Sequence, residues 1–572
     1  MFILGISAYY HDSAAALVKD GVVIAAAAEE RFNRKKHYKG FPTLACQFCL
    51  AYASIKIEDV DRIVFYEKPF RKFERIIRTH INYSPYGIKS FLSAMPIWLK
   101  ERLNMRGTIK KEIGKTFNYI PTNIFFCQHH FSHAALAYYT SPFKKCSILV
   151  VDAVGENATT SIIKASKEGF ETVEYQQFPH SLGLLYSSFT YYLGFQVNSD
   201  EYKVMGLAPY GNRDSDDYNK YKDTIIHYLV KIQDDGCIRL NDKLFAFTYD
   251  TRMVDDRKWA DLFGIPKREP HDPIKACHQN LALAIQDITE EIILKMADYA
   301  RRLTGIEDLC VVGGCSLNCV AIGKLLGKSK AGSVYVPFAP GDDGAAIGCA
   351  LYMSHSHTEG NNVPQSPYLG PSYSDRDVKN ALDDANIKYE YVSEINKLYS
   401  IVSNELAKGK IVGWFQGKME FGPRALGNRS ILADPRNHKM KEKINSRVKF
   451  RESFRPFAPS VLEDFVGEFF EIEDFSPYMA ATFKIKSDVM DLPAITHLDK
   501  TARIQTVSPN LNEKFYGLLN AFYKETACPI LLNTSFNVMG EPIVCTPNDA
   551  IKTFMASGID VLVLNHFIVR KI

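Results

Sequence analysis

Two histidines four residues apart, His129 and His133, stand at the start of an apolar stretch in the segment CQHHFSHAALAY. If this segment is helical, both imidazoles lie on one face with parallel side chains, a spacing that lets them bind one metal ion. Exposed histidines at the start of an ordinary helix would give the same pattern, because a short motif without context is a weak indication. The segment alone leaves both interpretations open.

Basic residues recur in glycine-, proline- and serine-rich stretches of the last third of the chain, such as FGPRALGNRS and KFRESFRPFAPS. Arginines in such loops bind phosphate or carboxylate through two parallel hydrogen bonds. Pairing with nearby acidic residues at the surface is the alternative. We favour an anion pocket, because the basic residues occur in the same domain as a strand with a polar end, ILLNTS. The candidate residues are Arg424, Lys449, Arg455, Arg503, Asn533 and Ser535.

A repeated pattern of strand, loop, strand, turn and strand predicts the scaffold of the first half. It begins with FILGIS and returns with SILVVD at Ser147, which favours a duplicated α/β domain. Two further strands end in glycine turns, at Gly313–Gly314 and at residues 341–344. Such turns expose backbone N–H groups at the start of a helix, where phosphate binds.

The length of 572 residues predicts at least two domains. The segment 356–373 mixes Ser, Asn, Gly and Pro, so we expect a linker there, between a first domain at 1–355 and a second at 374–572. The segment 212–273 is polar and irregular and is interpreted as an insertion. The segment 70–115 is another, whose basic and aromatic residues either line an acceptor pocket or form solvated helix faces.

Composition limits the partners that we expect. The chain has 69 basic and 65 acidic residues and a net charge of +4, which gives no support to nucleic-acid binding. No apolar run approaches the ~20 residues of a membrane span, and the N-terminus lacks a basic leader. The 12 cysteines show no disulfide-rich spacing. We therefore expect a cytoplasmic protein without a nucleic-acid or membrane partner; the oligomeric state is not predicted.

Ten motifs, taken in order, make the chain resemble the NodU/CmcH-type O-carbamoyltransferases. They are HDSAAALV, EERFNRKKH, QHHFSHA, VVDAVGE, KVMGLAPYG, VGGCSLN, GDDGAAIG, FGPRALGNRS, RVKFRESFRPFAPS and LNTSFN. The resemblance implies an α/β fold, with a duplicated ASKHA-type domain (the actin and sugar-kinase fold) followed by a YrdC-like α/β domain. It also implies ATP, accompanied by Mg²⁺, and carbamoyl phosphate as co-substrates. The acceptor would be a hydroxyl of a small molecule, a natural product or a sugar.

The resemblance also implies a divalent metal, usually iron (Fe²⁺), on the two histidines and two aspartates at strand ends. Carried over to this sequence, these ligands are His129, His133, Asp152 and Asp342. Two imidazoles with two carboxylates suit iron, manganese or zinc better than magnesium. Asp343 is the rival of Asp342, and the sequence does not separate them. We interpret His130 as structural or as an acceptor contact.

A reaction in two halves follows from the resemblance. The second domain would turn carbamoyl phosphate and ATP into carbamoyl adenylate, and the first would transfer the carbamoyl group. We expect the first domain to bind the adenylate through Gly155, Glu156, Gly313, Gly314, Ser316 and Asn318. His11, beside Asp12, is the candidate general base because the pKa of histidine lies near working pH; a loop-capping histidine is the alternative. Lys36 would steady charge on the leaving phosphate.

Two other functions remain open from the sequence. Carbamoyl transfer to tRNA or to a protein is the first, although the near-neutral charge argues against tRNA. A non-catalytic, ATP-binding regulator is the second, and it would not need the basic residues of the second domain.

Overall fold

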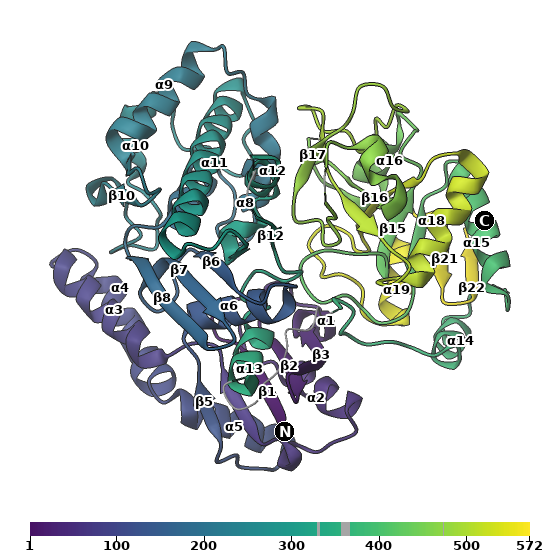
Figure 1. Cartoon of the computed structure of the whole chain (residues 1–572), viewed down its shortest axis with the longest axis horizontal. Coiled ribbons are helices and arrows are strands. Elements are labelled where there is room, and N and C mark those ends of the chain that lie inside the picture. The colour runs from purple at the N-terminus through teal and green to yellow at the C-terminus, as the bar shows by residue number, and fades with distance from the viewer. Residues whose placement is uncertain (329–331, 356–365, 453, 473, 572) are drawn as a thin grey trace. The chain divides into compact units, whose positions relative to one another are not determined.

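The computed structural model describes residues 1–328, 332–355, 366–452, 454–472 and 474–571 (Figure 1). The chain forms two units: unit 1 comprises Met1–Ile24 and Lys39–Gln365, and unit 2 comprises Ala25–Tyr38 and Ser366–Ile572. Residues 356–365 of the expected linker lie outside the described residues, and residues 366–373 belong to unit 2.

One segment belongs to a different unit from the one that the sequence predicts. The predicted first domain, 1–355, includes residues 25–38, but the structure assigns this segment to unit 2. Arg31 Nη2 donates to the carbonyl of Gly422 at 3.0 Å, and Arg34 donates to the carbonyls of Pro542 and Ile543 at 2.8 and 2.7 Å. These partners stand about 400 to 500 positions further along the chain, so no local pattern could reveal them.

Unit 1 is built on two five-stranded sheets with the same topology. The first has the order β3-β2-β1-β4-β5 and the second the order β8-β7-β6-β11-β12. In both, the first strand pairs antiparallel with the second and parallel with the fourth. This repetition confirms the duplicated α/β domain. The strands are β1 (Phe2–Ser7), β2 (Ala14–Lys19), β3 (Val22–Ala28), β4 (Arg62–Phe65), β5 (Ile124–Phe126), β6 (Cys146–Val151), β7 (Ala158–Ser166), β8 (Gly169–Gln177), β11 (Leu309–Val312) and β12 (Val334–Tyr335).

Two helices, α6 (His129–Thr140) and α13 (Ala345–His355), connect the two sheets of unit 1. They touch backbone to backbone, since a Cβ on Gly348 of α13 would overlap the carbonyl oxygen of Ser132 in α6. A Cβ on Gly5 of β1 would overlap the carbonyl oxygen of Ala346 in the same way. These contacts place α13 between β1 and α6, the helix that carries the histidine pair, and so fix the position of α6 relative to the first sheet.

The remaining helices of unit 1 include the long helix α11 (Ala276–Thr304). The expected irregular insertion 212–273 is instead folded: it contains helices, a two-stranded sheet and the fully buried Trp259. The elements are α2 (Thr43–Tyr52), α3 (Pro69–Tyr83), α4 (Ile88–Ile97), α5 (Met105–Phe117), α7 (Leu182–Tyr192), α8 (Glu201–Leu207), α9 (Asp216–Thr224), β9 (Val230–Ile232), β10 (Ile238–Leu240), α10 (Asp256–Phe263), α11 (Ala276–Thr304) and α12 (Cys319–Lys328).

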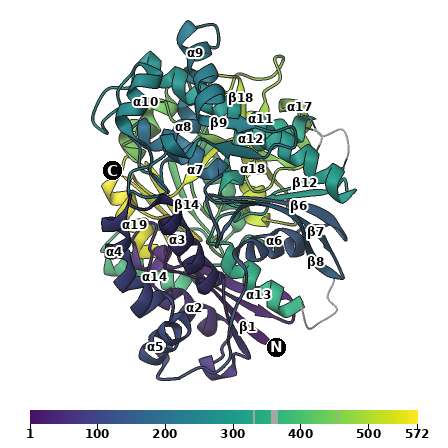
Figure 2. The same ribbon diagram turned by 90° about the vertical axis from the view of Figure 1, so that its left-hand side faces the viewer.

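Unit 2 contains an eight-stranded mixed sheet in the order β13-β22-β21-β14-β15-β20-β16-β19. Of these strands, Figure 2 labels β14. The central strands β14, β15 and β21 of the sheet are buried along their whole length. Helices accompany the sheet, which confirms the α/β class for this unit too. The elements are α1 (Glu30–Asn33), α14 (Asp375–Asp384), β13 (Glu390–Tyr391), α15 (Ile395–Ala407), β14 (Val412–Phe415), β15 (Arg429–Ala433), α16 (Met440–Ile444), β16 (Ala458–Leu462), α17 (Val466–Phe469), β17 (Thr482–Lys484), β18 (Thr501–Arg503), β19 (Gln505–Val507), α18 (Glu513–Thr526), β20 (Ile530–Ser535), α19 (Pro547–Ala556), β21 (Val561–Leu564) and β22 (Phe567–Arg570).

Within the described part of the chain, no helix combines the length and the apolar character needed to cross a bilayer.

The contact between α6 and α13 predicts that one added methyl group destabilises the protein at Gly348 but not at Gly327. Gly348→Ala should lower the free energy of unfolding by about 1–3 kcal/mol, because the new Cβ forces the two backbones apart. Gly327→Ala, in α12, is the matched control: a Cβ there meets no described atom within 4 Å. It should be neutral or stabilising by up to about 1 kcal/mol. Thermal unfolding followed by calorimetry measures both, and equal melting temperatures would show that the close contact is wrong.

Candidate metal site and anion pocket

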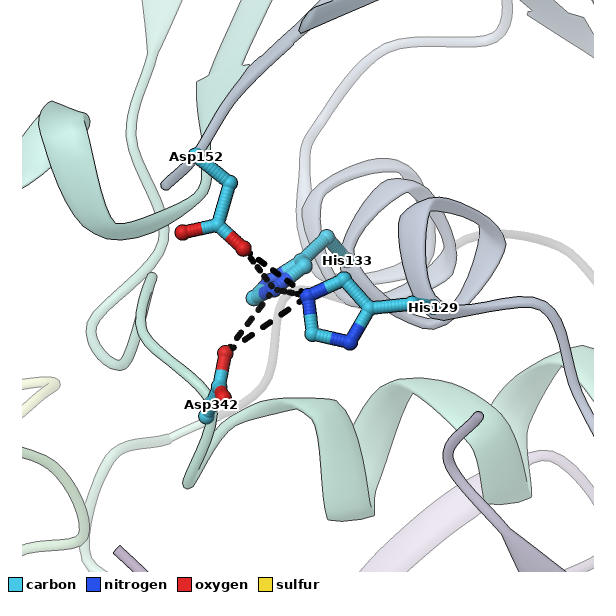
Figure 3. A group of neighbouring side chains, drawn as sticks. All are labelled: His129, His133, Asp152 and Asp342. Carbon is cyan, nitrogen blue, oxygen red and sulfur yellow. Dashed lines mark hydrogen bonds and ion pairs between the residues drawn. The ribbon is translucent and has the colours of Figure 1, made fainter. Parts of the chain in front are cut away.

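Four buried side chains of unit 1 converge on one point: His129, His133, Asp152 and Asp342 (Figure 3). The Nε2 atoms of the two histidines are 3.2 Å apart, and their donor atoms and those of the two carboxylates all lie within 4.8 Å of one another. His129 Nε2 is 2.9 Å from Asp152 Oδ2, and His133 Nε2 is 3.4 Å from Asp342 Oδ1. A cation about 2.1 Å from each donor would separate neighbouring donors by about 3–3.5 Å. The spacing fits a transition-metal ion.

The imidazoles and carboxylates of this cluster stabilise each other's charged forms. Burial lowers the pKa of His129, but the carboxylates of Asp342 and Asp152 raise it to about 9. Burial raises the pKa of Asp152, while the hydrogen bond from His129 and the charges of the imidazoles bring it below its ordinary value. The carboxylates therefore stay ionised in the protein interior and favour positive charge between them, which either imidazolium or a divalent cation can supply.

Glu156 and Gly155 position the first histidine. Glu156 Oε1 accepts hydrogen bonds from the backbone N–H groups of His129 and Lys68, both at 2.9 Å, and so caps the start of α6 with a negative charge. A Cβ on Gly155 would lie 2.9 Å from the ring of His129. From the resemblance, both residues are expected at the nucleotide. The contacts of Glu156 are with the backbone of the site, and nucleotide binding by the pair stays a prediction.

The neighbouring residues His130 and Asp343 contact other groups. His130 Nδ1 lies 2.6 Å from the Ser161 hydroxyl, and burial together with the charge of His129 lowers the pKa of His130 to about 3. Asp343 Oδ1 accepts from the backbone N–H of Gly344 at 2.9 Å. The structure thus brings Asp342, and not Asp343, into the cluster of possible metal ligands.

His11 lies in the loop after β1, next to the cluster. Its Nδ1 donates to Asp12 Oδ2 at 2.9 Å, and its Nε2 is 3.8 Å from Asp342 Oδ2. Burial lowers the pKa of His11, but Asp342 and Asp12 raise it to about 9. A cation on Asp152 and Asp342 would offset the negative charge that raises this pKa, so its occupancy and the ability of His11 to accept a proton are coupled.

The glycine turn after β11 reaches the same cluster. Gly314 N donates to Asp152 Oδ1 at 3.3 Å, and Gly313 has a φ of +94°, which favours glycine. Ser316 Oγ donates to the carbonyl of Gly313 at 2.7 Å, and Asn318 exchanges two hydrogen bonds of 3.0 Å with Gln286. These side chains shape the turn. Their contact with a nucleoside stays a prediction.

A second cluster, in unit 2, is strongly basic and surrounds the buried Lys449. Lys449 Nζ donates to the carbonyl and hydroxyl of Ser535 and to the carbonyl and side-chain oxygens of Asn537. Burial lowers the pKa of Lys449 well below its usual value, and the cations Arg451, Arg455 and Lys36 lower it further.

Lys36 belongs to this basic cluster, and not to the residues around His11 with which it is predicted to act. On the resemblance, Lys36 is grouped with the catalytic candidates His11 and Asp12, yet the fold places it in unit 2, where its charge acts on Lys449. Arg451 and Asn537 are not among the residues predicted from the sequence. Their only sequence signal is that they stand two positions from Lys449 and Ser535 within the quoted motifs.

The other predicted members of the anion pocket have partners of their own. The amide of Asn533 is buried and donates to Ser460 Oγ and Gln505 Oε1, both at 3.0 Å. It also donates to the carbonyl of Ala425, which follows Arg424 in the chain, at 3.4 Å. Arg503 lies on β18, near His497, whose pKa falls to about 4 through burial and the charge of Arg503.

Family models and relatives agree with the expectation from the motifs. The model described as the carbamoyltransferase N-terminus matches residues 2–351, and the model of the carbamoyltransferase C-terminus matches residues 403–571. The chain therefore belongs to the carbamoyltransferase family and is a transferase. The resemblance to NodU-type enzymes is confirmed, and the non-catalytic regulator loses its support.

Two relatives show how far the similarity extends. An uncharacterized protein of Synechocystis sp. is 46% identical over 605 residues, which covers 100% of this chain and 96% of the relative. Nodulation protein NolNO of Sinorhizobium fredii is 38% identical over 580 residues, covering 98% of this chain and 79% of that protein. Among solved structures, HypF of T. kodakarensis overlays with a TM-score of only 0.33 at 12% identity, covering 62% of this chain and 48% of that chain.

If the four-residue cluster binds a metal ion, the metal content of the protein should depend on these four residues and not on their neighbours in the chain. Purified protein should contain about one transition-metal ion per chain, and His133→Ala should lose most of it, because one of four ligands disappears. Asp342→Asn should behave in the same way. His130→Ala and Asp343→Asn, each one position from a ligand, are matched controls and should keep the metal. Elemental analysis by mass spectrometry measures all four, and full retention in His133→Ala would contradict the site.

Proposed function

We propose that this carbamoyltransferase works through carbamoyl adenylate. Carbamoyl phosphate and water give carbamate and phosphate; carbamate and ATP give carbamoyl adenylate and pyrophosphate. The hydroxyl of a small molecule, a natural product or a sugar, then takes the carbamoyl group and AMP leaves. The observation that carries this proposal is the buried basic cluster around Lys449 in a chain of this family.

The cluster is suited to anions for an electrostatic reason. The hydrogen-bond acceptors of Lys449 are uncharged oxygens of Ser535 and Asn537, while the neighbours that lower its pKa are cations. Buried like charges repel, so a bound anion would stabilise the group by restoring the ammonium and giving charge-assisted hydrogen bonds. Phosphate, carbamate and the phosphates of ATP all have this chemistry.

In unit 2 these residues would bind the reacting anions and stabilise their charge. A carbamate oxygen attacks the α-phosphorus of ATP, and the bond to the pyrophosphate oxygen breaks. Negative charge develops on the leaving pyrophosphate, where Lys449, Arg455 and Lys36 would neutralise it. Carbamate is unstable in water, so a buried position would also protect it from decomposition.

In unit 1 the chain's own residues would complete the transfer. A divalent cation on the four-residue cluster would supply a Lewis acid for the phosphate of the adenylate. His11 would accept the proton of the acceptor hydroxyl at Nε2, held in place by the hydrogen bond from Nδ1 to Asp12. The hydroxyl oxygen attacks the carbamoyl carbon, and the bond to the phosphate oxygen of AMP breaks. The acceptor itself stays open, and the near-neutral chain gives no support to tRNA.

Adenylation should depend on the basic cluster. Lys449→Ala should reduce pyrophosphate release from ATP in the presence of carbamoyl phosphate by about 10²–10³-fold, since a preorganised cation that stabilises the leaving group is lost. Lys439→Ala, at an exposed lysine ten positions earlier, is the control and should be unchanged. An assay of pyrophosphate release measures the effect, and a circular dichroism spectrum of each variant checks that its fold is intact. Near-normal release from Lys449→Ala would contradict adenylation at this cluster.

The two half-reactions should separate when His11 is removed. His11→Ala should still form carbamoyl adenylate but should transfer the carbamoyl group about 10²–10⁴-fold more slowly, because the base is needed only when the hydroxyl loses its proton. Mass spectrometry of the adenylate and of the carbamoylated acceptor measures both steps. His271→Ala, at an exposed histidine, is the control. Parallel loss of both steps would show that His11 supports structure or nucleotide binding instead.

A further inference from the structure

A helical hairpin of unit 1 exposes large apolar side chains to solvent. It consists of α3, α4 and the π-helical turn Trp98–Arg102, and is called the exposed hairpin below (Figure 1). Leu92 and Leu99 are 62% and 60% exposed, and Phe70 is 72% exposed. The other exposed large apolar side chains of the hairpin are Ile81, Tyr86, Ile88 and Ile97. Such a concentration on one element marks an interaction surface.

The exposed side chains are not the ones that hold the hairpin together. Its two arms pack through Phe73 against Trp98, with ring centroids 5.9 Å apart, and through His80 stacked on Phe91 at 3.8 Å. The tip is anchored by the hydroxyl of Tyr83, which donates to Asp242 Oδ2 at 2.9 Å. The hairpin is therefore folded and fixed to unit 1 while its outer apolar side chains remain uncovered.

The outer apolar residues follow helical spacing. Ile88, Leu92 and Leu99 are four and seven positions apart, which puts them on one side of the second arm. In an ordinary surface helix this stripe faces the core, whereas here it faces solvent and is flanked by the exposed Lys89 and Lys100. An apolar stripe flanked by lysines is typical of a helix that lies in the plane of a membrane surface.

The charge of the exposed hairpin indicates the kind of surface on which it can dock. The exposed hairpin, residues 69–102, has 7 Lys and Arg against 2 Asp and Glu, a net charge of +5, whereas the whole chain has +4, so the rest of the chain carries −1. Anionic headgroups attract such a segment with about 1 kcal/mol per basic residue near the surface. A second copy of the chain on this face would bring two positive surfaces together, which charge repulsion opposes.

The geometry points to docking of the exposed hairpin on an anionic lipid surface. Ile88, Leu92 and Leu99 enter the boundary between headgroups and acyl chains, and Lys89 and Lys100 contact the headgroups. From the sequence we expect no membrane partner, because no apolar run approaches the length of a membrane span. A helix that lies on the surface needs no span, so that expectation excluded only one kind of membrane contact.

The exposed hairpin is also joined to the loop that carries His11. Lys72 pairs with Glu67 at 2.7 Å and lies 4.8 Å above the ring of Tyr10, and Arg102 lies 4.9 Å from the ring of Tyr9. A docked hairpin would therefore hold this loop close to the lipid surface. The docking itself does not depend on the proposed reaction, because it rests on the exposed side chains and charge of the hairpin.

Vesicle flotation of the full-length protein tests the proposal. Wild-type protein should float with vesicles of phosphatidylcholine and phosphatidylglycerol at low salt, should float far less with phosphatidylcholine alone, and should be released by about 0.5 M NaCl. Leu92→Ser with Leu99→Ser should weaken binding at least about tenfold through lost apolar burial. Lys89→Glu with Lys100→Glu should weaken it about 10–100-fold through reversed charge.

Matched controls use equally exposed residues of unit 2: Leu498→Ser with Met555→Ser, and Lys397→Glu with Lys408→Glu. Both should bind vesicles like the wild type, and all variants should keep the wild-type melting temperature. Equal flotation with neutral and anionic vesicles, or unchanged binding by the hairpin variants, would overturn the proposal. So would a hairpin variant that changes the oligomeric mass in sedimentation and leaves vesicle binding intact, because that result identifies a second copy as the occupant.

Discussion

Burial of ionised groups of opposite sign at one point is the constraint on which unit 1 depends. Asp152 and Asp342 stay charged in the interior only because the imidazoles of His129 and His133, or a cation between them, balance their charge. This balance depends on the position of α6, which carries both histidines, and of the turn before α13, which carries Asp342. The close backbone contact at Gly348 and the cap that Glu156 provides both help to fix these positions.

The buried charge in unit 2 is positive, whereas the carboxylates buried in unit 1 are negative. In unit 2 the buried ammonium of Lys449 is surrounded by neutral oxygens and by other cations, an arrangement that a bound anion would stabilise. A unit prepared for a cation and a unit prepared for anions suit a reaction that forms an activated phosphate intermediate and then uses it. Buried ionisable groups with shifted pKa values, such as His129 and Lys449, are concentrated at functional sites.

The exposed hairpin shows a third use of charge, at the surface. A chain with a net charge of only +4 distributes that charge so unevenly that the 34 residues of the hairpin, 69–102, carry +5. The net charge of the whole chain therefore gives no sign of this basic, apolar element. Balanced composition argues against non-specific binding by the chain as a whole, but it gives no information on a single face.

The sequence by itself determined the class of protein, the duplicated first domain and the residue types of both clusters. The pattern of apolar residues sets strands and helices, and motifs such as QHHFSHA and GDDGAAIG are local enough to be recognised. Only the tertiary structure separated Asp342 from Asp343, because adjacent residues differ only in where the backbone directs them. It also decided that Lys36 and Arg31 belong to unit 2, since their partners lie about 400 residues away in the chain. The exposure of Leu92 and Leu99 is of the same kind: periodicity shows which residues share a helix face, and only the packing of the other elements decides whether that face is covered.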